Sequence, residues 1–549
     1  MYPSHKTRND PGQSRVKELS DLLQDELCSL KTIRFLKSPA AEEACEYLTG
    51  VLGKSPLLLK ELDLSGDKLG DLDGEKLSAL LMDSHSKLEK IMLNNCDLTE
   101  KSCSVLATVL SSKTNLKEMN LNNSRLLDSG VKEICEGLKN PVCELKILNL
   151  NNNCITEGDC HVLAAALNSN PSNLTELDLS ENKLGNPGMK IILTLFENVQ
   201  CRLEKLKLKC ISITDEGCAA LASAFHSNLR ELDLSRNQIG DSGVTEISSL
   251  LRNSQCTLQI LSLNNNCITE GGCHVLAAAL NSNPSNLTEL DLSENKLGNP
   301  GMKIILTLFE NVQCRLEKLK LKCISITDEG CAALASAFHS NLRELDLSRN
   351  QIGDSGVTEI SSLLRNSQCT LQILRFLKSP AAEEACEYLT GVLGKSPLLL
   401  KELDLSGDKL GDLDGEKLSA LLMDSHSKLE KIMLNNCDLT EKSCSVLATV
   451  LSSKTILKEM NLNNSRLLDS GVKEICEGLK NPVCELKILK AEAERAALRA
   501  KAATLDEKLA LDVEEANMVA KLKARKERHA LECELAAAEA KVKVYKEAI

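Results

Sequence analysis

The chain has 549 residues, 42% of them hydrophobic, which is enough to build a large buried core. Its formal net charge of −12 argues against a general nucleic-acid binder or a protein that docks on anionic membranes. The sequence contains no run of about 18 apolar residues, so it predicts no membrane span. Aromatic residues make up only 2% and Trp is absent, so aliphatic side chains, alanine and cysteine must fill the core.

The N-terminal segment, residues 1–29, is first polar and then helical in pattern. An apolar stripe at helical spacing runs through Val16, Leu19, Leu22, Leu23 and Leu27. We expect a helix that covers the open end of a repeat stack, as solenoids require, or else the remnant of a domain lost upstream. Residues 1–12 carry no apolar signal-peptide core, which favours a cytoplasmic protein.

From residue 30 to residue 489 one unit recurs, L-x-x-L-x-L-x-x-N-x-L, followed by a glycine and a short helical pattern. Its clearest copy contains Leu174, Leu177, Leu179, Asn182 and Leu184. Sixteen complete units and a truncated seventeenth follow each other every 26 to 29 residues. This period has room for a strand and a helix, and predicts an α/β leucine-rich-repeat solenoid: a horseshoe with a concave parallel sheet and convex helices.

Alternation within a unit predicts which side chains are buried. Leu177 and Leu179 should point into the core, whereas Asp178 and Ser180 should point outward. Gly188 is expected to end the loop before the helix. The helical stripe of the same unit consists of Met189, Ile192, Leu193 and Phe196.

The ninth position of the unit is usually polar. The asparagines there, such as Asn153 and Asn182, should hydrogen-bond the backbone of the turn and of the next layer. Cys96 and Ser124 could do part of this. Ile211 and its copy Ile324 could not, so their turns should be looser. The remaining ninth-position residues of the first copies are Asp67 and Asn237.

A larger duplication overlies the repeats. Residues 150–261 return as 263–374 with Asp159 replaced by Gly272, and residues 34–148 return as 375–489 with Asn115 replaced by Ile456. The joints keep the repeat period, so one unbroken stack is physically allowed. Such near-identity indicates either a recent duplication or an artefact of gene assembly, and a non-functional product of a duplicated gene is one alternative reading.

Residues 490–549 contain no Gly or Pro and are rich in Ala, Glu, Lys and Leu, which predicts one long charged helix. A heptad seam is formed by Leu531, Leu535, Ala538, Val542, Tyr545 and Ile549. The segment is therefore either a solvated single helix or a coiled coil that makes a homodimer.

The sequence predicts no catalytic residues, cofactor or metal. Gly53-Lys54-Ser55 resembles the end of a phosphate-binding loop, but Leu48 stands where that loop needs its first glycine. Cys154, Cys160 and His161 lack the further ligands of a zinc site. The 24 cysteines recur at equivalent repeat positions and should be reduced, mostly buried thiols.

The segments LTELDLSENKLGNPGMKIIL and LRELDLSRNQIGDSGVTEISSLL resemble the C-terminal repeats of NOD-like receptors, which carry NACHT and leucine-rich-repeat domains. The likeness covers residues 30–489. Ribonuclease inhibitor and the Ran GTPase-activating protein share this repeat length. No NACHT, death-fold or PYD domain is recognisable. The resemblance implies a non-enzymatic ligand-sensing or regulatory module of innate immunity; the alternative is an accessory regulator of an enzyme, a GTPase activator or ribonuclease inhibitor.

We expect a protein partner on the concave face, where the strand positions are polar and rich in Asn and Asp, with a basic interruption on one strand. The candidate residues are Asp63, Asn94, Asn122, Asn151, Asp178, Ser180, Lys207, Lys209, Asp233, Arg236, Asn264, Asp291, Asp346 and Arg349. The alternative is that these are ordinary solvated residues of the repeat. Because binding hot spots favour Trp, Tyr and Arg, the lack of aromatics predicts a weak or multivalent complex.

Overall fold

The computed structural model describes residues 32–34, 59–65, 74–96, 98–224, 228–336, 341–366, 369–375, 400–404, 406, 415–425, 427–435, 437, 439–463, 465 and 469–490. They fall into two compact units. Unit 1 is Met1–Gln351 with Gln368–Leu371, and unit 2 is Ile352–Ser367 with Gln372–Ile549. The helix expected within residues 1–29, the helix expected after Lys490 and the Gly53-Lys54-Ser55 triplet lie outside the described residues.

The strands of unit 1 form a parallel sheet in which each strand pairs with that of the next repeat. They are β1 (Thr32–Arg34), β2 (Glu61–Asp63), β3 (Lys90–Met92), β4 (Glu118–Asn120), β5 (Ile147–Asn149), β6 (Glu176–Asp178), β7 (Lys205–Lys207), β8 (Glu231–Asp233), β9 (Ile260–Ser262), β10 (Glu289–Asp291), β11 (Lys318–Lys320) and β12 (Glu344–Asp346). Each begins two residues after the first leucine of its repeat. Equivalent residues therefore lie opposite each other, as Leu177 and Leu206 do.

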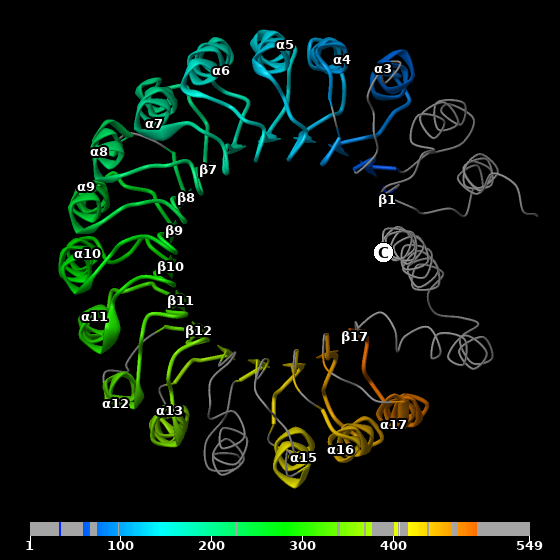
Figure 1. The fold of residues 1–549 in the computed structure, drawn as a ribbon, viewed down its shortest axis with the longest axis vertical. Coiled ribbons are helices and arrows are strands. Elements are labelled where there is room, and N and C mark those ends of the chain that lie inside the picture. The colour runs from blue at the N-terminus through cyan, green and yellow to red at the C-terminus, as the bar shows by residue number, and fades with distance from the viewer. Residues whose placement is uncertain are drawn as a thin grey trace, which may run out of the picture. The chain divides into compact units, whose positions relative to one another are not determined.

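The helices of unit 1 follow the outside of an arc whose inside is lined by the strands (Figure 1). They are α3 (Gly74–Met82), α4 (Glu100–Leu110), α5 (Asp128–Lys139), α6 (Glu157–Ser169), α7 (Gly185–Leu193), α8 (Asp215–Cys218), α9 (Asp241–Arg252), α10 (Glu270–Ser282), α11 (Gly298–Leu306) and α12 (Asp328–Ser336), with the 3₁₀ helices η1 (Thr194–Glu197), η2 (Ala219–Ala224) and η3 (Thr307–Glu310). Strands stack about 4.8 Å apart whereas helices need about 10 Å, so the strands take the inner side of the curve.

Unit 2 repeats the same arrangement, with strands paired in parallel from β13 to β17. Its elements are α13 (Asp354–Arg365), β13 (Ile373–Arg375), β14 (Glu402–Asp404), α15 (Gly415–Met423), β15 (Lys431–Met433), α16 (Glu441–Leu451), β16 (Glu459–Asn461), α17 (Asp469–Leu479) and β17 (Ile488–Lys490). Lys490, expected to begin the long helix, is part of β17 because it pairs with Asn461. The repeat therefore extends one residue further than expected.

The core of each layer lies between strand and helix. Leu177 and Leu179 of the β6 layer are fully buried, and so are Met189 and Ile192 of α7. Phe196 of η1 is buried as well. Each such side chain contributes roughly 1.5–3 kcal/mol by leaving water, so the leucine pattern accounts for the inward direction that the sequence predicts.

Gly188 corrects one expectation, because it lies inside α7 rather than in the loop before it. A Cβ at this position would lie 2.8 Å from Leu184 Cβ and 3.3 Å from Cys160 Sγ of the preceding helix. Gly130 of α5 faces Cys103 of α4 in the same way, with 3.0 Å between the added Cβ and Sγ. The glycine is therefore required by close helix packing and not by a turn.

The ninth-position asparagines join successive layers, as the sequence predicts, but their side chains bond the preceding layer and not the next one. Asn182 Nδ2 donates to the carbonyl of Leu150 in the preceding layer at 2.9 Å and to that of Leu179 at 2.8 Å. Its Oδ1 accepts the N–H groups of Asn153 at 2.8 Å and Ile155 at 3.0 Å. One buried amide thus satisfies backbone groups of two layers, which would otherwise be buried without partners.

The turn at Ile211 is closed by the Asn237 side chain of the next layer and by the main chain of Gly185. The Ile211 N–H donates to Asn237 Oδ1 at 3.0 Å, and its carbonyl accepts the N–H of Gly185 at 2.8 Å. Gly185 has φ +62, a left-handed conformation that glycine adopts without strain. The looser turn expected here is therefore not seen, and Ile324 is bonded in the same way to Asn350 and Gly298.

The Asp159 to Gly272 difference changes a helix cap. Asp159 Oδ2 accepts the Thr156 N–H at 2.9 Å and completes a capping box at the start of α6. In the second copy, Thr269 N–H donates instead to Asp241 Oδ1 of the preceding layer at 2.8 Å. The neighbouring layer thus supplies the carboxylate that the helix itself has lost.

The Asn115 to Ile456 difference removes a contact between layers. Asn115 Nδ2 donates to the Ser86 carbonyl at 2.6 Å, and Asn228 bonds the Cys201 carbonyl in the same manner at 3.0 Å. Ile456 has no side-chain donor and leaves 42% of its surface exposed. The second copy therefore loses one hydrogen bond and gains an exposed apolar side chain.

Replacing Ile456 by Asn should stabilise unit 2 by about 0.5–1.5 kcal/mol, because the amide can reach the Ser427 carbonyl as Asn115 reaches Ser86. Urea unfolding followed by circular dichroism measures the change. The reverse substitution, Asn115→Ile, should destabilise unit 1 by a similar amount. An unchanged or lower unfolding midpoint for Ile456→Asn would show that this contact does not hold the layers together.

Candidate protein-binding face

All fourteen candidate residues lie on the sheet side of unit 1, at the strands and the turns directly after them. We name two rows of this inner face. The strand-end row contains Asp63, Met92, Asn120, Asn149, Asp178, Lys207, Asp233, Ser262, Asp291, Lys320 and Asp346. The turn row, two residues on, contains Ser65, Asn94, Asn122, Asn151, Ser180, Lys209, Ser235, Asn264, Ser293, Lys322 and Ser348.

The candidates differ in accessibility. Arg236 and Arg349 are exposed, whereas Asp63 is 6% and Ser180 2% exposed. The remaining candidates are half-buried, namely Asn94, Asn122, Asn151, Asp178, Lys207, Lys209, Asp233, Asn264, Asp291 and Asp346. Asp63 and Ser180 lie on the inner face as expected, but the structure buries both, whereas Ser180 was expected to project into solvent.

The buried residues of these rows have structural bonds. Asp63 Oδ1 accepts the Ser65 N–H at 2.9 Å, and Asp178 Oδ1 accepts the Ser180 N–H at 2.9 Å. Ser180 Oγ in turn accepts the Lys209 N–H of the next layer at 3.2 Å. The short side chains therefore fold back onto the main chain, which explains why period-two alternation alone overstates their exposure.

The turn-row asparagines have the same role. Asn94 Oδ1 accepts the Asn122 N–H at 3.1 Å, and Asn122 Oδ1 accepts the Asn151 N–H at 3.1 Å. One residue further, the exposed side chains are linked as well, since Asn152 Nδ2 donates to Asn123 Oδ1 at 3.0 Å. Hydrogen bonds of amide side chains thus link the layers of β3, β4 and β5, and the surface they leave is polar and uncharged.

A further row, which the sequence did not reveal, consists of the first residues of the strands, and in β2 to β4, β6 to β8 and β10 to β12 these residues are Glu or Lys. Lys205 Nζ lies 3.5 Å from Glu176 and 3.8 Å from Glu231, so it bridges β6, β7 and β8. Lys207 adds a second contact to Glu176 at 3.7 Å. Charges of opposite sign lie directly across the parallel strands, an arrangement that stabilises cross-strand pairs. The signal was present as Glu-Lys-Glu at equivalent positions of consecutive repeats.

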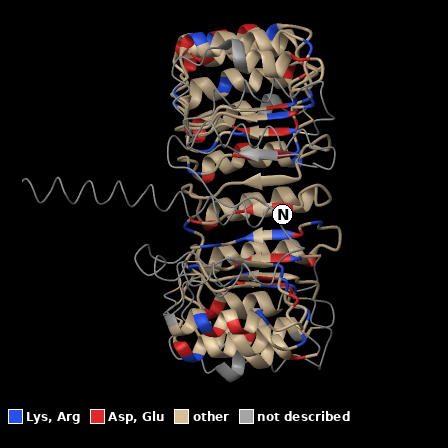
Figure 2. Cartoon of the chain, turned by 90° about the vertical axis from the view of Figure 1, so that its right-hand side faces the viewer, with Lys and Arg blue, Asp and Glu red and all other residues tan. Residues whose placement is uncertain are grey.

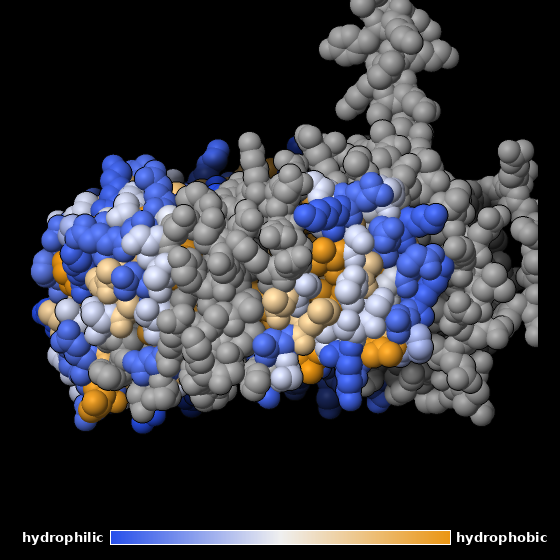
Figure 3. Space-filling model, turned by 90° about the horizontal axis from the view of Figure 1, so that it is seen from below, coloured by the Kyte–Doolittle hydropathy of each residue, from blue (hydrophilic) through white to orange (hydrophobic). Residues whose placement is uncertain are grey.

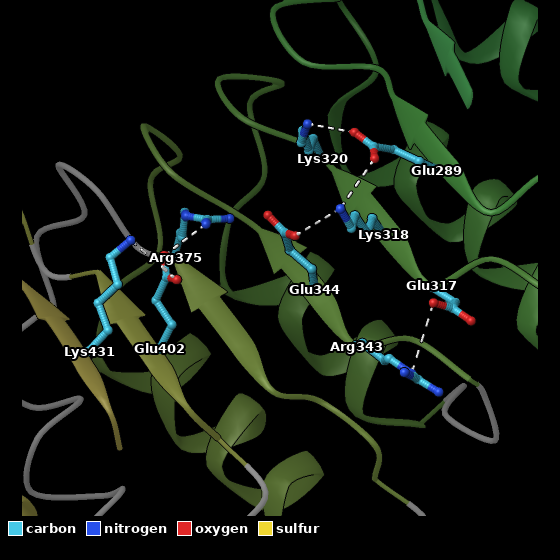
Figure 4. A network of polar contacts seen from close by, with 9 residues as sticks. All are labelled: Glu289, Glu317, Lys318, Lys320, Arg343, Glu344, Arg375, Glu402 and Lys431. Atoms are coloured by element: carbon cyan, nitrogen blue, oxygen red, sulfur yellow. Dashed lines mark hydrogen bonds and ion pairs between the residues drawn. The ribbon is translucent and has the colours of Figure 1, made fainter. Parts of the chain in front are cut away.

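The duplicated segment repeats this network at β10 to β12, where Figure 4 shows Lys318 between Glu289 and Glu344. Lys320 Nζ approaches Glu289 at 2.7 Å. Unit 2 has its own version, in which Glu402 contacts Arg375 at 2.8 Å. Acidic and basic residues are accordingly interspersed over the strands and helices (Figure 2).

These contacts decide the ionisation of the inner face. Burial opposes the charged form of Glu289, but the hydrogen bond and charge of Lys320 prevail and lower the pKa of that carboxyl. Burial likewise opposes the charge of Lys320, yet Glu289 raises its pKa. Burial raises the pKa of Asp291, against the hydrogen bonds it receives from Ser293. The Lys320–Glu289 pair therefore stays charged at neutral pH.

The cysteines of the described residues are free. Cys103, Cys160, Cys218 and Cys273 are buried in the helix layer, and burial, reinforced by nearby carboxylates, raises the pKa of each thiol to about 12. Four cysteines outside the helices are instead exposed, namely Cys154, Cys210, Cys267 and Cys323, whereas Cys96 and Cys437 in the equivalent turns of other layers are buried. The expectation of mostly buried thiols thus holds for the helices and is wrong for these turns.

The rows of polar and charged side chains are carried by a recognisable repeat. A model of the leucine-rich repeat matches residues 170–192, 225–248, 283–305 and 338–361. Mouse ribonuclease inhibitor is 34% identical over 483 residues, which cover 86% of this chain and 92% of that protein. The chain belongs to the ribonuclease-inhibitor family of leucine-rich-repeat proteins.

A second group of relatives agrees with the resemblance to NOD-like receptors. Human NACHT, LRR and PYD domains-containing protein 12 is 38% identical over 312 residues, which cover 56% of this chain and 29% of that protein. The chain thus matches less than a third of that relative's length. Among the residues that the structure describes, no helix is long and apolar enough to cross a membrane.

Alkylation should separate the two classes of cysteine. With iodoacetamide at pH 8, Cys154, Cys210, Cys267 and Cys323 should react at least about tenfold faster than Cys160, because a thiol with a pKa near 12 is almost wholly protonated and also shielded. Peptide mass spectrometry of the native protein measures each site. Equal labelling rates for Cys160 and Cys210 would contradict the layer packing, and labelling after denaturation provides the control.

Proposed function

We propose that the chain is a non-catalytic scaffold that binds a partner protein on the inner face of unit 1. The observation that carries the proposal is the row structure of that face, in which polar and charged side chains are fixed by the register of β2 to β12. A rigid face loses little side-chain freedom on association, which favours binding. The family relationship supports the same reading, since mouse ribonuclease inhibitor is named for acting on another protein.

We further propose that the binding serves a ligand-sensing or regulatory role in innate immunity within the cytoplasm. The support is the likeness to the leucine-rich repeats of the NACHT, LRR and PYD relatives. Because the chain spans about a third of those proteins, the proposal concerns recognition by the repeats and not the activity of the whole relatives.

The surface chemistry favours weak or multivalent association. On β6 to β8, Lys205 and Lys207 are paired with Glu176 and Glu231, and the remaining charges of these layers are of both signs, so long-range attraction to one sign of partner is modest. Figure 3 views the molecule from below, outside the inner face, and the described surface there is mainly hydrophilic, with hydrophobic residues in small separate groups. Scattered apolar residues of this kind do not form a large hydrophobic interface. Recognition would then depend on polar contacts and on the few large side chains.

Reversing three inner-face charges tests the proposal. The variant Lys207→Glu, Lys209→Glu and Arg236→Glu should lose the partners that the wild-type protein captures from cytosolic extract, by about tenfold or more. The matched control, Lys101→Glu, Lys132→Glu and Arg252→Glu, changes the same charge on exposed cations of α4, α5 and α9 and should retain them. Identical partner sets and amounts for both triple variants would refute binding on the inner face.

A second candidate is inhibition of a ribonuclease, favoured by the 92% coverage of mouse ribonuclease inhibitor. In that case purified protein should suppress ribonuclease A activity stoichiometrically, and the inner-face triple variant should not. Undiminished hydrolysis at micromolar protein would eliminate this candidate and leave the general scaffold proposal standing.

A further inference from the structure

We propose that unit 1 carries two equivalent docking sites for acidic peptide segments, one centred on Arg236 and one on Arg349. The inference rests on the proposed scaffold function and adds to it the chemistry and the number of the bound segments. Arg236 lies in the turn after β8, and Arg349 lies in the turn after β12. Each directly follows a residue of the turn row.

The backbone at Arg236 holds its side chain outward. Its φ is +56, a left-handed conformation, and its N–H donates to the Asn264 carbonyl of the next layer at 2.7 Å. Arg349 has φ +57 and is exposed as well. Among the described residues neither guanidinium takes part in an ion pair or side-chain hydrogen bond. A planar guanidinium with all its donors free is suited to a carboxylate, which it can bind through two parallel hydrogen bonds.

Lysines of the preceding layer extend each cationic site. Lys209 is fixed by its N–H bond to Ser180 Oγ, and the following residue, Cys210, donates its N–H to the Ser235 carbonyl at 2.9 Å. Lys209 and Arg236 therefore lie on neighbouring layers, about 4.8 Å apart along the stack at the backbone. Lys209 also has no ion-pair partner among the described residues. In the second copy Lys322 contacts Glu294 loosely at 3.8 Å, so Arg349 is the main anchor there.

The carboxylates nearest to the first site are already engaged. Glu176 and Glu231 lie at the other end of their strands and contact Lys205. Asp233 Oδ1 accepts the Ser235 N–H at 2.9 Å. Glu181 is exposed and lies beside Lys209, since its N–H donates to the Lys209 carbonyl at 2.7 Å, but it is two layers from Arg236. At this end, β7 and β8 carry Lys207, Lys209 and Arg236 against Asp233, so the surface next to Arg236 is locally cationic and complements an acidic segment.

The duplication fixes the spacing of the two sites. Four layers separate β8 from β12, which corresponds to about 19 Å at 4.8 Å per strand. A partner with two acidic segments could occupy both sites at once, and linkage of two weak contacts raises the overall affinity. This agrees with a face that lacks aromatic anchors and depends on multivalent binding.

Carbodiimide coupling to an acidic probe tests the two sites directly. The probe is a hexaglutamate peptide with an acetylated N-terminus and an amidated C-terminus, so that only side-chain carboxylates can react. The carbodiimide activates a probe carboxylate, the amine of a lysine attacks it, and an amide forms while the urea leaves. Intact mass should show up to two peptides per chain, and peptide mapping should place them on Lys207 or Lys209 and on Lys320 or Lys322.

Variants assign each coupling to its arginine. Arg236→Glu should reduce coupling at the first site about tenfold and leave the second unchanged, and Arg349→Glu should do the reverse. Glutamate is tolerated in this backbone conformation, because Glu181 has φ +58 and Glu294 has φ +57 in the same row. The matched controls are Arg230→Glu and Arg343→Glu, which remove arginines already paired with Glu204 at 3.9 Å and Glu317 at 4.0 Å. Both sites should remain reactive in these controls.

Coupling that is absent, that falls equally on Lys101 and Lys132 of the helices, or that is insensitive to both arginine variants would overturn the two-site inference. Such a result, together with partner loss in the inner-face triple variant, would leave the scaffold function intact with another contact chemistry. Two-site coupling without any dependence of captured partners on the inner face would instead contradict the proposed function alone.

Discussion

The structure depends on the hydrogen bonds that link each turn to the next layer. A leucine-rich layer cannot bury both of its open sides by itself, so the layers must stack, and stacking buries the polar backbone of every turn. Asn182 shows the solution, because its one amide bonds backbone groups of its own layer and of the preceding layer. Where Ile211 cannot do this, Gly185 adopts a left-handed conformation and the main chain closes the gap.

The surface chemistry follows from this constraint. Once the layers are locked in register, equivalent residues of consecutive repeats face each other, and a Glu-Lys-Glu succession becomes a ladder of ion pairs. From β3 to β12, the residue that follows each turn-row residue has a left-handed backbone conformation. At two of these positions the residue is an exposed arginine, Arg236 or Arg349. The exposed surface that remains consists of these arginines, the exposed Glu181 in the same row and the uncharged asparagine surface of β3 to β5. The family relationship to ribonuclease inhibitor is consistent with a face built for recognition.

Much of the fold could be predicted from the sequence, because the repeat period and the alternation of apolar and polar residues indicate which side chains point into the core. The strand positions and the buried Leu177 and Leu179 follow from one repeat unit read by itself. Features that depend on two layers could not be predicted in that way. The burial of Ser180, the packing of Gly188 on Cys160 and the bridge at Lys205 each involve residues from neighbouring repeats. The repeat pattern records such partners only if the units are compared position by position.

The most direct test of the account is the stability of Asn182→Ala, measured by urea unfolding beside Asn168→Ala. Asn168 is an exposed residue of α6, whereas Asn182 is buried between layers. Loss of the Asn182 amide should lower the free energy of unfolding by at least ~2 kcal/mol, because buried backbone groups would lose their hydrogen-bond partners. Asn168→Ala should change the free energy of unfolding by less than ~0.5 kcal/mol. Adding Asn295→Ala, the equivalent change four layers on, should roughly double the loss. Equal unfolding midpoints for Asn182→Ala and Asn168→Ala would contradict the account.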